Sequence, residues 1–330
     1  MCSSFWLKIP FLAECIGIFL SSTSNCILVL LILLTPRTTF GTYKYLMLSF
    51  SALGICYSGA NFLAQPNVVL TQTSFAVFTE LHGVTKRIGT FFVSCIASIY
   101  ALMLSLLSLQ FYYRFIAVTS PTTLSSRFSL RTLPIYTVLI FLNAASWGLV
   151  SYYLNGPTLE KDLDLAPVLK SLYCLAPNSY AYIGIKYFTL TSSNQRVFLA
   201  SGFLLILTPI ALLMSLFSML LYFGLGTYSS LKRKAMSQKN KDMQNQLLRT
   251  LVIQTVIPFC FMILPVGCMY LIPIIGWDIG ASANLIAALV AIYPCFEPLV
   301  AMYCIKCFRM RIIGIITCRR HKNAQVSAIT

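Results

Sequence analysis

Two charged residues interrupt the long apolar runs of this sequence, and both could do polar chemistry in nonpolar surroundings. Arg114 closes the apolar run that begins at Gly89, directly after two tyrosines. Glu297 lies between Pro294 and Pro298 in the last apolar run. An acid within an apolar helix is costly, so its presence indicates a functional site by default. Arg114 and Glu297 could therefore pair with, hold or release charged and hydrogen-bonding groups.

Each of these charges also has an ordinary explanation. Arg114 could be a plain stop-transfer cation at the end of a membrane span. Glu297 could lie near an interface, where it would reach polar surroundings or pair with a basic loop residue. For both residues the two interpretations stay open. Glu14, one turn into the first apolar run, is expected to reach the outer interface.

Residue types that carry catalysis or bind metals are scarce. The only two histidines are His82 and His321, and no residues have paired metal-ligand spacing. The sequence contains no Gly-rich phosphate loop and no nucleophile elbow. It therefore predicts a protein that is not an enzyme and that holds no metal or cofactor.

The composition indicates that a bilayer, rather than water, surrounds most of the chain. Of the 330 residues, 58% are hydrophobic and 10% are charged, which would leave a soluble protein with too much apolar surface. The formal net charge of +16 would suit nucleic-acid binding. The basic residues, however, lie in short segments between apolar runs, where they set membrane orientation. We therefore expect contact with membrane lipids and no binding of nucleic acid.

Seven apolar runs are long enough to cross a hydrocarbon core of about 30 Å as helices, which rise about 1.5 Å per residue. Because that core contains no water, helices must satisfy their own backbone hydrogen bonds. The sequence predicts an all-α membrane protein, a seven-transmembrane helix bundle with a short basic tail at 306–330. The predicted spans are 11–34, 45–65, 89–117, 133–154, 197–223, 250–273 and 279–305. The longest connection, 155–196, is expected to be polar.

Basic residues are divided unevenly between the two membrane faces. The segments after the first, third, fifth and seventh spans, counted together with Arg114 at the end of the third span, hold 17 of the 24 Lys and Arg, and the amino-terminal segment and the other loops hold 7. Cytoplasmic loops carry the excess of positive charge in membrane proteins. We therefore expect the amino terminus outside and the carboxyl terminus in the cytoplasm.

Five short motifs, in their order and spacing, resemble those of a known family. FYYRFIAV closes the third span at 111–118, and QLLR at 246–249 leads into QTVIP at 254–258. IYPCFEPL at 292–299 is followed by IKCFR at 305–309. Together with seven spans and a short outer amino-terminal segment, these motifs resemble the nematode serpentine chemoreceptors of the Str group. The resemblance covers nearly the whole chain.

This resemblance implies a G protein-coupled receptor that responds to an odorant or another small chemical cue and activates a heterotrimeric G protein. It also implies a multi-pass protein of the plasma membrane, in the sensory cilium of chemosensory neurons. The alternative is a multi-span transporter or a ligand-gated channel. The scarcity of charge within the spans and the lack of two matching halves speak against that alternative.

The resemblance also implies roles for the two intramembrane charges. Arg114 matches the arginine of the acid-Arg-Tyr motif of rhodopsin-like receptors, in which the acid holds the arginine until activation releases it to the G protein. Tyr113 stands in the place of that acid, so any restraint on Arg114 must come from elsewhere or be weaker. Glu297 and Pro298 resemble the Asn-Pro or Asp-Pro pair of related receptors, which implies a role in switching.

Helical periodicity suggests which residues face a ligand pocket in the outer half of such a receptor. Ile96 and Tyr100 lie 18 and 14 residues before Arg114 and so fall near its helix face. The other candidates flank a proline of the sixth span and are Phe261, Met262, Met269 and Tyr270. Each of these residues could also be an ordinary packing residue. Helix breaks are expected at Pro209, Pro258, Pro265 and Pro294.

The predicted cytoplasmic side carries a basic segment and several cysteines. The basic segment begins with Lys232, Arg233 and Lys234 and could contact a G protein, although binding of anionic lipid or calmodulin has the same signature. Palmitoylation is expected beside a short membrane-surface helix, at Cys304, Cys307 and Cys318. On the other side, a disulfide between Cys95 and Cys174 is not expected, because Cys95 lies deep in its span.

Overall fold

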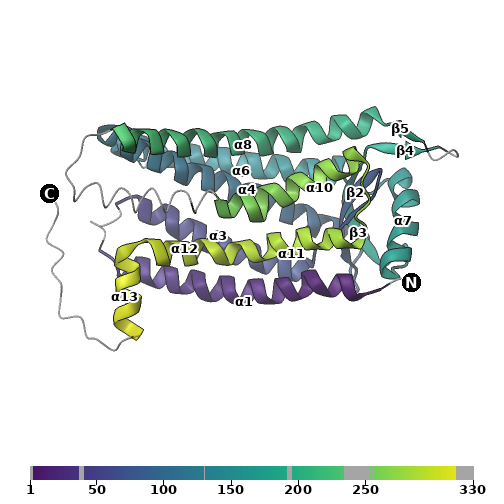
Figure 1. Cartoon of the computed structure of the whole chain (residues 1–330), viewed down its shortest axis with the longest axis horizontal. Helices are drawn as coiled ribbons and strands as arrows, with labels where there is room; N and C mark the ends of the chain where they lie inside the picture. Colours follow the sequence, from purple (N-terminus) through teal and green to yellow (C-terminus); the bar gives the residue numbers. More distant parts are fainter. Residues whose placement is uncertain are drawn as a thin grey trace.

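Helices that run side by side form most of the molecule, a computed structural model that describes residues 3–36, 41–129, 131–191, 195–233, 253 and 256–316. Within these ranges, seven helical spans are long and apolar enough to cross a membrane. They are α1 (Phe5–Leu34), α3 (Tyr43–Ala64), α4 (Lys86–Thr119), α6 (Leu133–Leu149) with the π-turn η2 (Val150–Leu154), α8 (Ala200–Arg233), the π-turn η3 (Phe259–Ile263) with α10 (Leu264–Ile275), and η4 (Ala281–Ala283) with α11 (Asn284–Ile292), η5 (Tyr293–Cys295) and α12 (Phe296–Cys304). Figure 1 shows an elongated bundle. The predicted all-α class and seven-helix bundle are confirmed.

Helix α4 is packed against three neighbours because one of its faces is apolar along much of its length. Tyr100, Leu104, Leu107 and Phe111 are buried and recur every three or four residues, which places them on one helix face. This helix packs against α3, α6 and α8. Outward-facing residues of the bundle, such as Phe141 on α6, are exposed, which suits contact with lipid.

The seventh span is broken where its prolines cluster. Its first helix ends at Ile292, a 3-10 turn follows, and α12 begins at Phe296. Pro298 has no N–H, so the carbonyl of Pro294 loses its helical donor. The side chain of Asn25 on α1 replaces that donor, because its Nδ2 lies 3.3 Å from the Pro294 oxygen. The prediction of a break at Pro294 is confirmed, and α1 supplies the repair.

A small sheet covers one end of the bundle. Strands β1 (Asn67–Leu70), β2 (Ser74–Glu80) and β3 (Tyr180–Lys186) pair antiparallel in the order β1-β2-β3. In the register, Val77 on β2 is opposite Val68 on β1 and Ile183 on β3. Figure 1 shows this sheet, α7 and the amino terminus at the same end, called here the sheet end.

The connection 155–196 differs from the polar loop that the sequence predicts. It contains α7 (Leu159–Tyr173), all of β3, and β4 (Phe188–Leu190), which pairs with β5 (Arg196–Phe198). Every residue of β3 is buried. The physical reason is its run of aromatic and aliphatic residues, which is typical of a strand.

The expectation that Glu14 reaches an interface is wrong. Helix α1 begins at Phe5, six residues before the predicted span. Glu14 therefore lies nine residues, or about 14 Å, into the helix. Its side chain is 2% exposed, so it is a buried acid.

The opposite end of the bundle carries α13 (Lys306–Ile316), a short helix that Figure 1 shows lying across the ends of the spans. The buried side chain of Phe308 attaches it to a core cluster of α1 and α12 residues. The sequence predicts a short helix here, and the helix is present. Cys304 and Cys307 have free thiols, whereas Cys318 lies outside the described residues.

The two cysteines considered for a disulfide have different states. Cys174 is disulfide-bonded, and Cys95 has a free thiol. The expectation that these two do not pair with each other is therefore confirmed. Cys174 lies at the end of α7, outside the spans.

Candidate functional site

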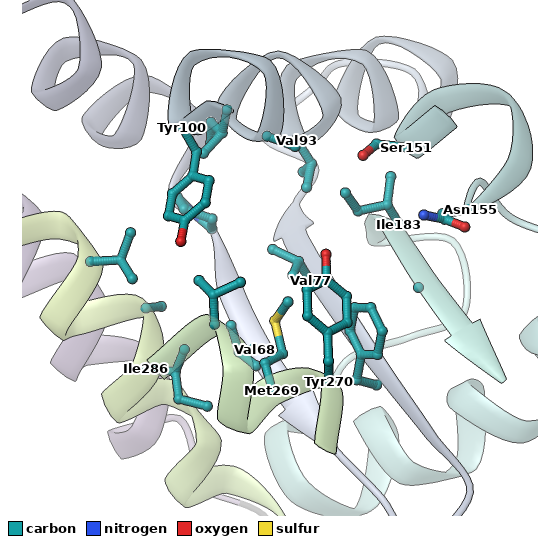
Figure 2. Close-up of a pocket in the computed structure, with 18 of the residues that line it drawn as sticks. Val68, Val77, Val93, Tyr100, Ser151, Asn155, Ile183, Met269, Tyr270 and Ile286 are labelled. Atoms are coloured by element: carbon teal, nitrogen blue, oxygen red, sulfur yellow. The ribbon is translucent and has the colours of Figure 1, made fainter. Parts of the chain in front are cut away.

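A cavity of about 100 Å³ lies directly under the sheet, between the sheet and the helices. Figure 2 shows side chains from the strands and from several helices surrounding this space. We call it the sheet-end cavity. Its lining is mostly apolar or aromatic and includes Tyr57, Val68, Phe75, Val77, Val93, Ile96, Ala97, Tyr100, Trp147, Ile183, Val266, Met269, Tyr270, Ile286, Ala287 and Val290.

Two polar atoms on the cavity wall have no hydrogen-bond partner among the residues that the structure describes. They are the Tyr57 hydroxyl and Asn155 Oδ1, and both belong to buried residues. Asn61 lies close to the Tyr57 hydroxyl, but the defined hydrogen bond of its Nδ2 is to the Tyr57 backbone oxygen, at 2.9 Å. Leaving a buried polar group unpaired costs about 1–3 kcal/mol. The cavity therefore offers one hydroxyl and one acceptor oxygen to a small ligand.

The sheet forms one wall of the cavity, where β3 approaches the neighbouring strand β2 closely. Gly184 lines the cavity. Its N–H donates to the backbone oxygen of Asn155 at 2.8 Å, and this bond ties β3 to the end of the fourth span. A Cβ at this position would overlap the backbone oxygen of Phe75. Only glycine allows β2 and β3 to close the cavity at this point.

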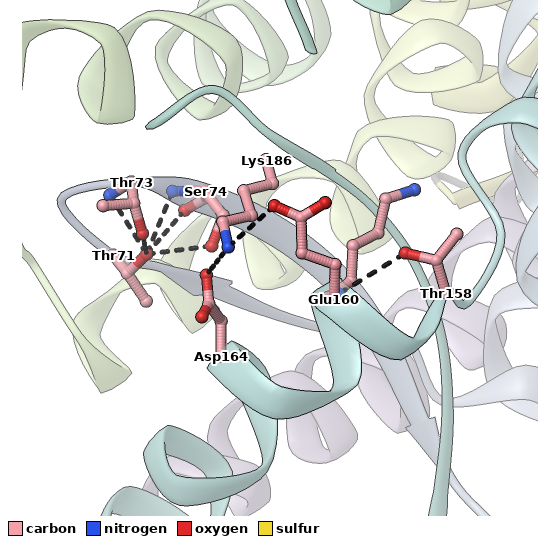
Figure 3. Close-up of polar contacts among 8 residues, drawn as sticks. Thr71, Thr73, Ser74, Thr158, Glu160, Asp164 and Lys186 are labelled. Atoms are coloured by element: carbon pink, nitrogen blue, oxygen red, sulfur yellow. Dashed lines mark hydrogen bonds and ion pairs between the residues drawn. The ribbon is translucent and has the colours of Figure 1, made fainter. Parts of the chain in front are cut away.

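An ion cluster around the buried amine of Lys186 fastens β3 to α7 outside the cavity. Figure 3 shows the Lys186 amine between two acids of α7. Lys186 Nζ lies 2.6 Å from Asp164 Oδ2 and 3.1 Å from Glu160 Oε1, and the Lys186 side chain is only 6% exposed. Burial lowers the pKa of Lys186, but the bonds to Asp164 and Glu160 outweigh it, so the pKa is raised. Lys186 is therefore charged at neutral pH and holds the sheet in place.

Local bonds fix the elements on both sides of this cluster. The Thr158 hydroxyl accepts from Lys161 N at 3.4 Å and caps the first turn of α7. The β1–β2 turn is held by Thr71, whose N–H donates to the Ser74 oxygen at 2.9 Å and whose Oγ1 accepts from Ser74 N at 3.0 Å. Figure 3 shows this turn beside Lys186.

The predicted pocket residues divide into two groups. Ile96, Tyr100, Met269 and Tyr270 all line the sheet-end cavity. Met262 and Phe261 do not, and for them the prediction is wrong. Met262 contributes its backbone oxygen, which accepts from the Tyr100 hydroxyl at 3.1 Å. Phe261 instead packs on the Phe296 ring, with centroids 4.6 Å apart.

The π-turn η3 explains these two errors, since both residues lie within it. A π-turn adds a residue to the helical turn and changes the face on which nearby side chains lie. Pro258 and Pro265 flank this irregular turn, as predicted. Pro209 instead lies inside the continuous helix α8, so no helix end occurs there.

At the opposite end of the bundle, Arg114 is held by a tyrosine from another helix. Its Nη2 and Nε donate to the Tyr43 hydroxyl at 2.6 and 3.1 Å. The guanidinium carbon also lies 5.2 Å from the centre of the Tyr43 ring. Tyr113 packs beside this ring, and its hydroxyl lies 3.2 Å from Thr42 Oγ1. The restraint on Arg114 comes from Tyr43, at the start of α3.

Glu297 and Arg114 line the same small cavity, about 20 Å³ in volume. The Glu297 side chain is 5% exposed, so it is a buried acid rather than an interfacial one. Pro298 and Gln110 lie on the same wall. Tyr303 is 58% exposed and points away from the core. The structure therefore brings Arg114 and Glu297 together around one small cavity.

The basic segment is only partly described. Lys232 is exposed in the last turn of α8, and Arg233 is the final residue of that helix. Lys234 lies outside the described residues.

Comparison with known proteins identifies the family. Residues 11–313 match the model of the serpentine type 7TM GPCR chemoreceptor Str family. The chain belongs to this family. Its members are G protein-coupled chemoreceptors, which are not enzymes.

Similar proteins of this family come from nematodes. "Serpentine receptor class r-10" of Caenorhabditis elegans is 26% identical, and the aligned region covers 100% of this chain and 97% of that receptor. "G-protein coupled receptor str-33" of C. elegans is 25% identical, with 91% and 89% covered. Among solved structures, squid rhodopsin matches with a TM-score of 0.64 at 12% identity, covering 95% of this chain and 87% of rhodopsin. The Str receptor therefore has the rhodopsin fold.

Sequence reasoning missed several important residues of this Str receptor. The sheet contributes Val68, Phe75, Val77, Ile183 and Gly184 to the cavity, and its strand pattern is visible in the aromatic and β-branched runs. Tyr43 has no sequence signal of its own, since its contact with Arg114 joins residues 71 positions apart.

Proposed function

We propose that this Str receptor binds a small, weakly polar molecule in the sheet-end cavity and activates a heterotrimeric G protein through its opposite end. The observation that carries the proposal is the apolar cavity with two unpaired polar atoms. Its volume is well below the roughly 300–1,000 Å³ of drug-sized pockets. The ligand is therefore a molecule of few non-hydrogen atoms with a carbonyl or hydroxyl group, as expected for an odorant.

The proposed orientation places the sheet end outside the cell and the α13 end in the cytoplasm. It rests on the division of basic residues, 17 against 7, across the two ends. The receptor would lie in the plasma membrane, in the sensory cilium of a chemosensory neuron. In this orientation Arg114, Lys232 and α13 would face the G protein and anionic lipids. We propose the same contacts for the basic residues Arg233 and Lys234.

Arg114 is the proposed coupling residue, and Tyr43 is its resting-state restraint. A phenol hydroxyl takes the place that an acid holds in the acid-Arg-Tyr motif. Glu297 lines the same cavity as Arg114, and it would stabilise the guanidinium when Tyr43 releases it. Pro298 supports this step, because the helix around it has lost part of its hydrogen-bond ladder.

A chain of buried tyrosines connects the two ends in this proposal. Tyr57 and Tyr100 line the sheet-end cavity. Tyr293, fully buried, is close enough to both of them and to Glu297 to interact electrostatically. A ligand that bonds the Tyr57 hydroxyl would therefore shift the environment of Tyr293, one turn before Glu297. Cys304, Cys307 and Cys318 are proposed palmitoylation sites that would hold α13 to the membrane.

A signalling screen of volatile and water-soluble compounds on cells that express the receptor tests this function. The matched variants are Ala97→Leu, which fills the sheet-end cavity, and Ala145→Leu, which adds the same volume to the exposed side of α6. We expect an active compound whose response is lost in Ala97→Leu and kept in Ala145→Leu at equal surface density. A response that survives in Ala97→Leu would place the ligand elsewhere.

A further inference from the structure

A second space at the sheet end contains a buried acid that the proposed function does not use. It is a groove of about 490 Å³ between α1 and the segments that follow α3, β2 and α7. We call it the Glu14 groove. Leu7, Phe11 and Glu14 lie on one face of α1, spaced three or four residues apart, and all three line it. None of its lining residues lines the sheet-end cavity.

Three acceptor oxygens in this groove have no hydrogen-bond partner among the described residues. Two of them are Oε1 and Oε2 of Glu14, which is 2% exposed. The third is Oδ1 of Asn67, which is 5% exposed. The Asn67 amide orientation is set by its Nδ2, which donates to the Gln65 oxygen at 3.0 Å. The buried part of the groove therefore presents three unpaired acceptor oxygens, together with the hydroxyl of the buried Tyr173.

Such an arrangement favours the binding of a positively charged group. A carboxylate buried without a partner is strongly disfavoured, so buried acids are paired, coordinated or protonated. In the described part of the chain, ion pairs involve Lys186 and no basic residue lies within salt-bridge distance of Glu14. Lys8, Glu80 and His82 also line the groove, but Lys8 and His82 are exposed.

We infer that the Glu14 groove binds a small primary ammonium group. An ammonium has three N–H donors, which match the three unpaired oxygens of Glu14 and Asn67. Leu7 and Phe11 supply apolar contact for a short alkyl chain. A divalent metal is disfavoured, because the described residues hold no cluster of three metal-ligating side chains and Ca²⁺ takes six to eight oxygens.

The ammonium has two possible sources with the same chemistry. One is a free alkylamine in solution. The other is the ethanolamine headgroup of a phospholipid, which could reach the groove past Phe11, an exposed apolar residue of α1.

Thermal unfolding of the full-length purified chain tests the inference without any signalling readout, so it stays separate from the proposed function. In maltoside micelles, n-butylammonium chloride is compared with KCl and NaCl at equal ionic strength and with 1-butanol as the neutral isostere. We expect a saturable rise of Tm with butylammonium alone. The apparent affinity for butylammonium should fall at least tenfold in Glu14→Gln and also in Asn67→Ala. Asn67→Ala keeps the test decisive if Glu14→Gln does not fold. Asp278→Asn is the control for general loss of negative charge, because Asp278 is exposed and does not line the groove.

Nanodiscs of phosphatidylethanolamine and of phosphatidylglycerol form the second arm. The Tm could be higher in phosphatidylethanolamine than in phosphatidylglycerol for the wild type but not for Glu14→Gln. If butylammonium had no effect at the same time, this result would assign the site to the headgroup and support the inference. Equal Tm changes with butanol or NaCl, equal changes in wild type and Glu14→Gln, or no change in either arm would overturn it.

Discussion

The guanidinium of Arg114 donates two hydrogen bonds to a single oxygen, the Tyr43 hydroxyl, and lies over the same ring. A hydrogen bond to a charged group contributes about 1.5–3 kcal/mol, and a cation–π contact about 0.5–1 kcal/mol at an exposed site. A neutral phenol lacks the charge of the acid found in the acid-Arg-Tyr motif. The restraint on Arg114 is therefore weaker, and some signalling without ligand is expected.

Removal of one oxygen tests this restraint. Tyr43→Phe keeps the ring but abolishes both hydrogen bonds from Arg114, so we expect basal G protein activation to rise about tenfold or until it saturates. Tyr45→Phe is the matched control, because Tyr45 is an exposed residue of the same helix. Basal activity at equal surface density is the measurement. Equal basal activity in wild type and Tyr43→Phe would show that this bond does not restrain the receptor.

At the scale of elements, the sheet depends on the contact between β3 and α7. Lys186 is buried and bonded to Asp164 and Glu160, which are themselves partly exposed. Loss of the amine would leave two neighbouring acids without their shared cation. Because β3 closes the sheet-end cavity, its attachment should determine how long a ligand stays bound.

Lys186→Met tests this attachment. We expect faster hydrogen exchange in the β3 amides and several-fold faster ligand dissociation, since the side chain keeps its volume but loses its charge. Lys170→Met is the control, because Lys170 is an exposed residue of α7. Unchanged β3 exchange in Lys186→Met would mean that strand pairing alone holds the sheet. The pKa of Lys186 is raised, so its stabilising contribution is present at neutral pH and is lost only when strongly alkaline pH exceeds this raised pKa.

The elements differ in how far the sequence could predict them. A long apolar run in a membrane has few alternatives to a helix, and the seven spans follow the apolar runs closely. Helix α8 continues beyond its apolar run to Arg233, because the polar residues that follow extend the same helix. The sheet was missed because β3 is a short strand, with six apolar residues before Lys186, within a connection that also carries the charges of α7. Phe261 and Met262 were misplaced because a π-turn cannot be recognised from regular 3.6-residue periodicity.

For the candidate site, the sequence identified the residues that are unusual by themselves. Arg114 and Glu297 stand out as charges at or within apolar runs, and the structure places both at one small cavity. Tyr43, Asn25 and Asn155 do not stand out, because their importance comes from a partner distant in sequence or from the lack of one. Such relations exist only once the helices have packed.

At the scale of the whole molecule, the orientation follows from charge and can be tested directly. The 17 basic residues on the predicted inner side favour an inside carboxyl terminus. We expect an epitope tag after Thr330 to be labelled only in permeabilised cells, and a tag before Met1 to be labelled on intact cells. Labelling of the carboxyl-terminal tag on intact cells would invert the proposed outside and inside.

In the proposed function, ligand binding in the sheet-end cavity activates a G protein at the opposite end of the receptor through Arg114. Arg114→Ala removes the cation but keeps the apolar run of α4, so insertion and ligand binding should persist. Arg131→Ala is the control, since it removes the same charge from the adjoining loop. A transporter or channel would keep its flux in both variants, because Arg114 would then be one inside charge among many.

The most direct measurement is ligand-dependent G protein activation by wild type, Arg114→Ala and Arg131→Ala at matched surface density, with ligand binding measured in parallel. We expect Arg114→Ala to bind the ligand but to lose at least nine-tenths of its activation (about tenfold) and also its basal activity. Arg131→Ala should respond like wild type. Equal activation in Arg114→Ala and wild type would contradict the proposed role of Arg114.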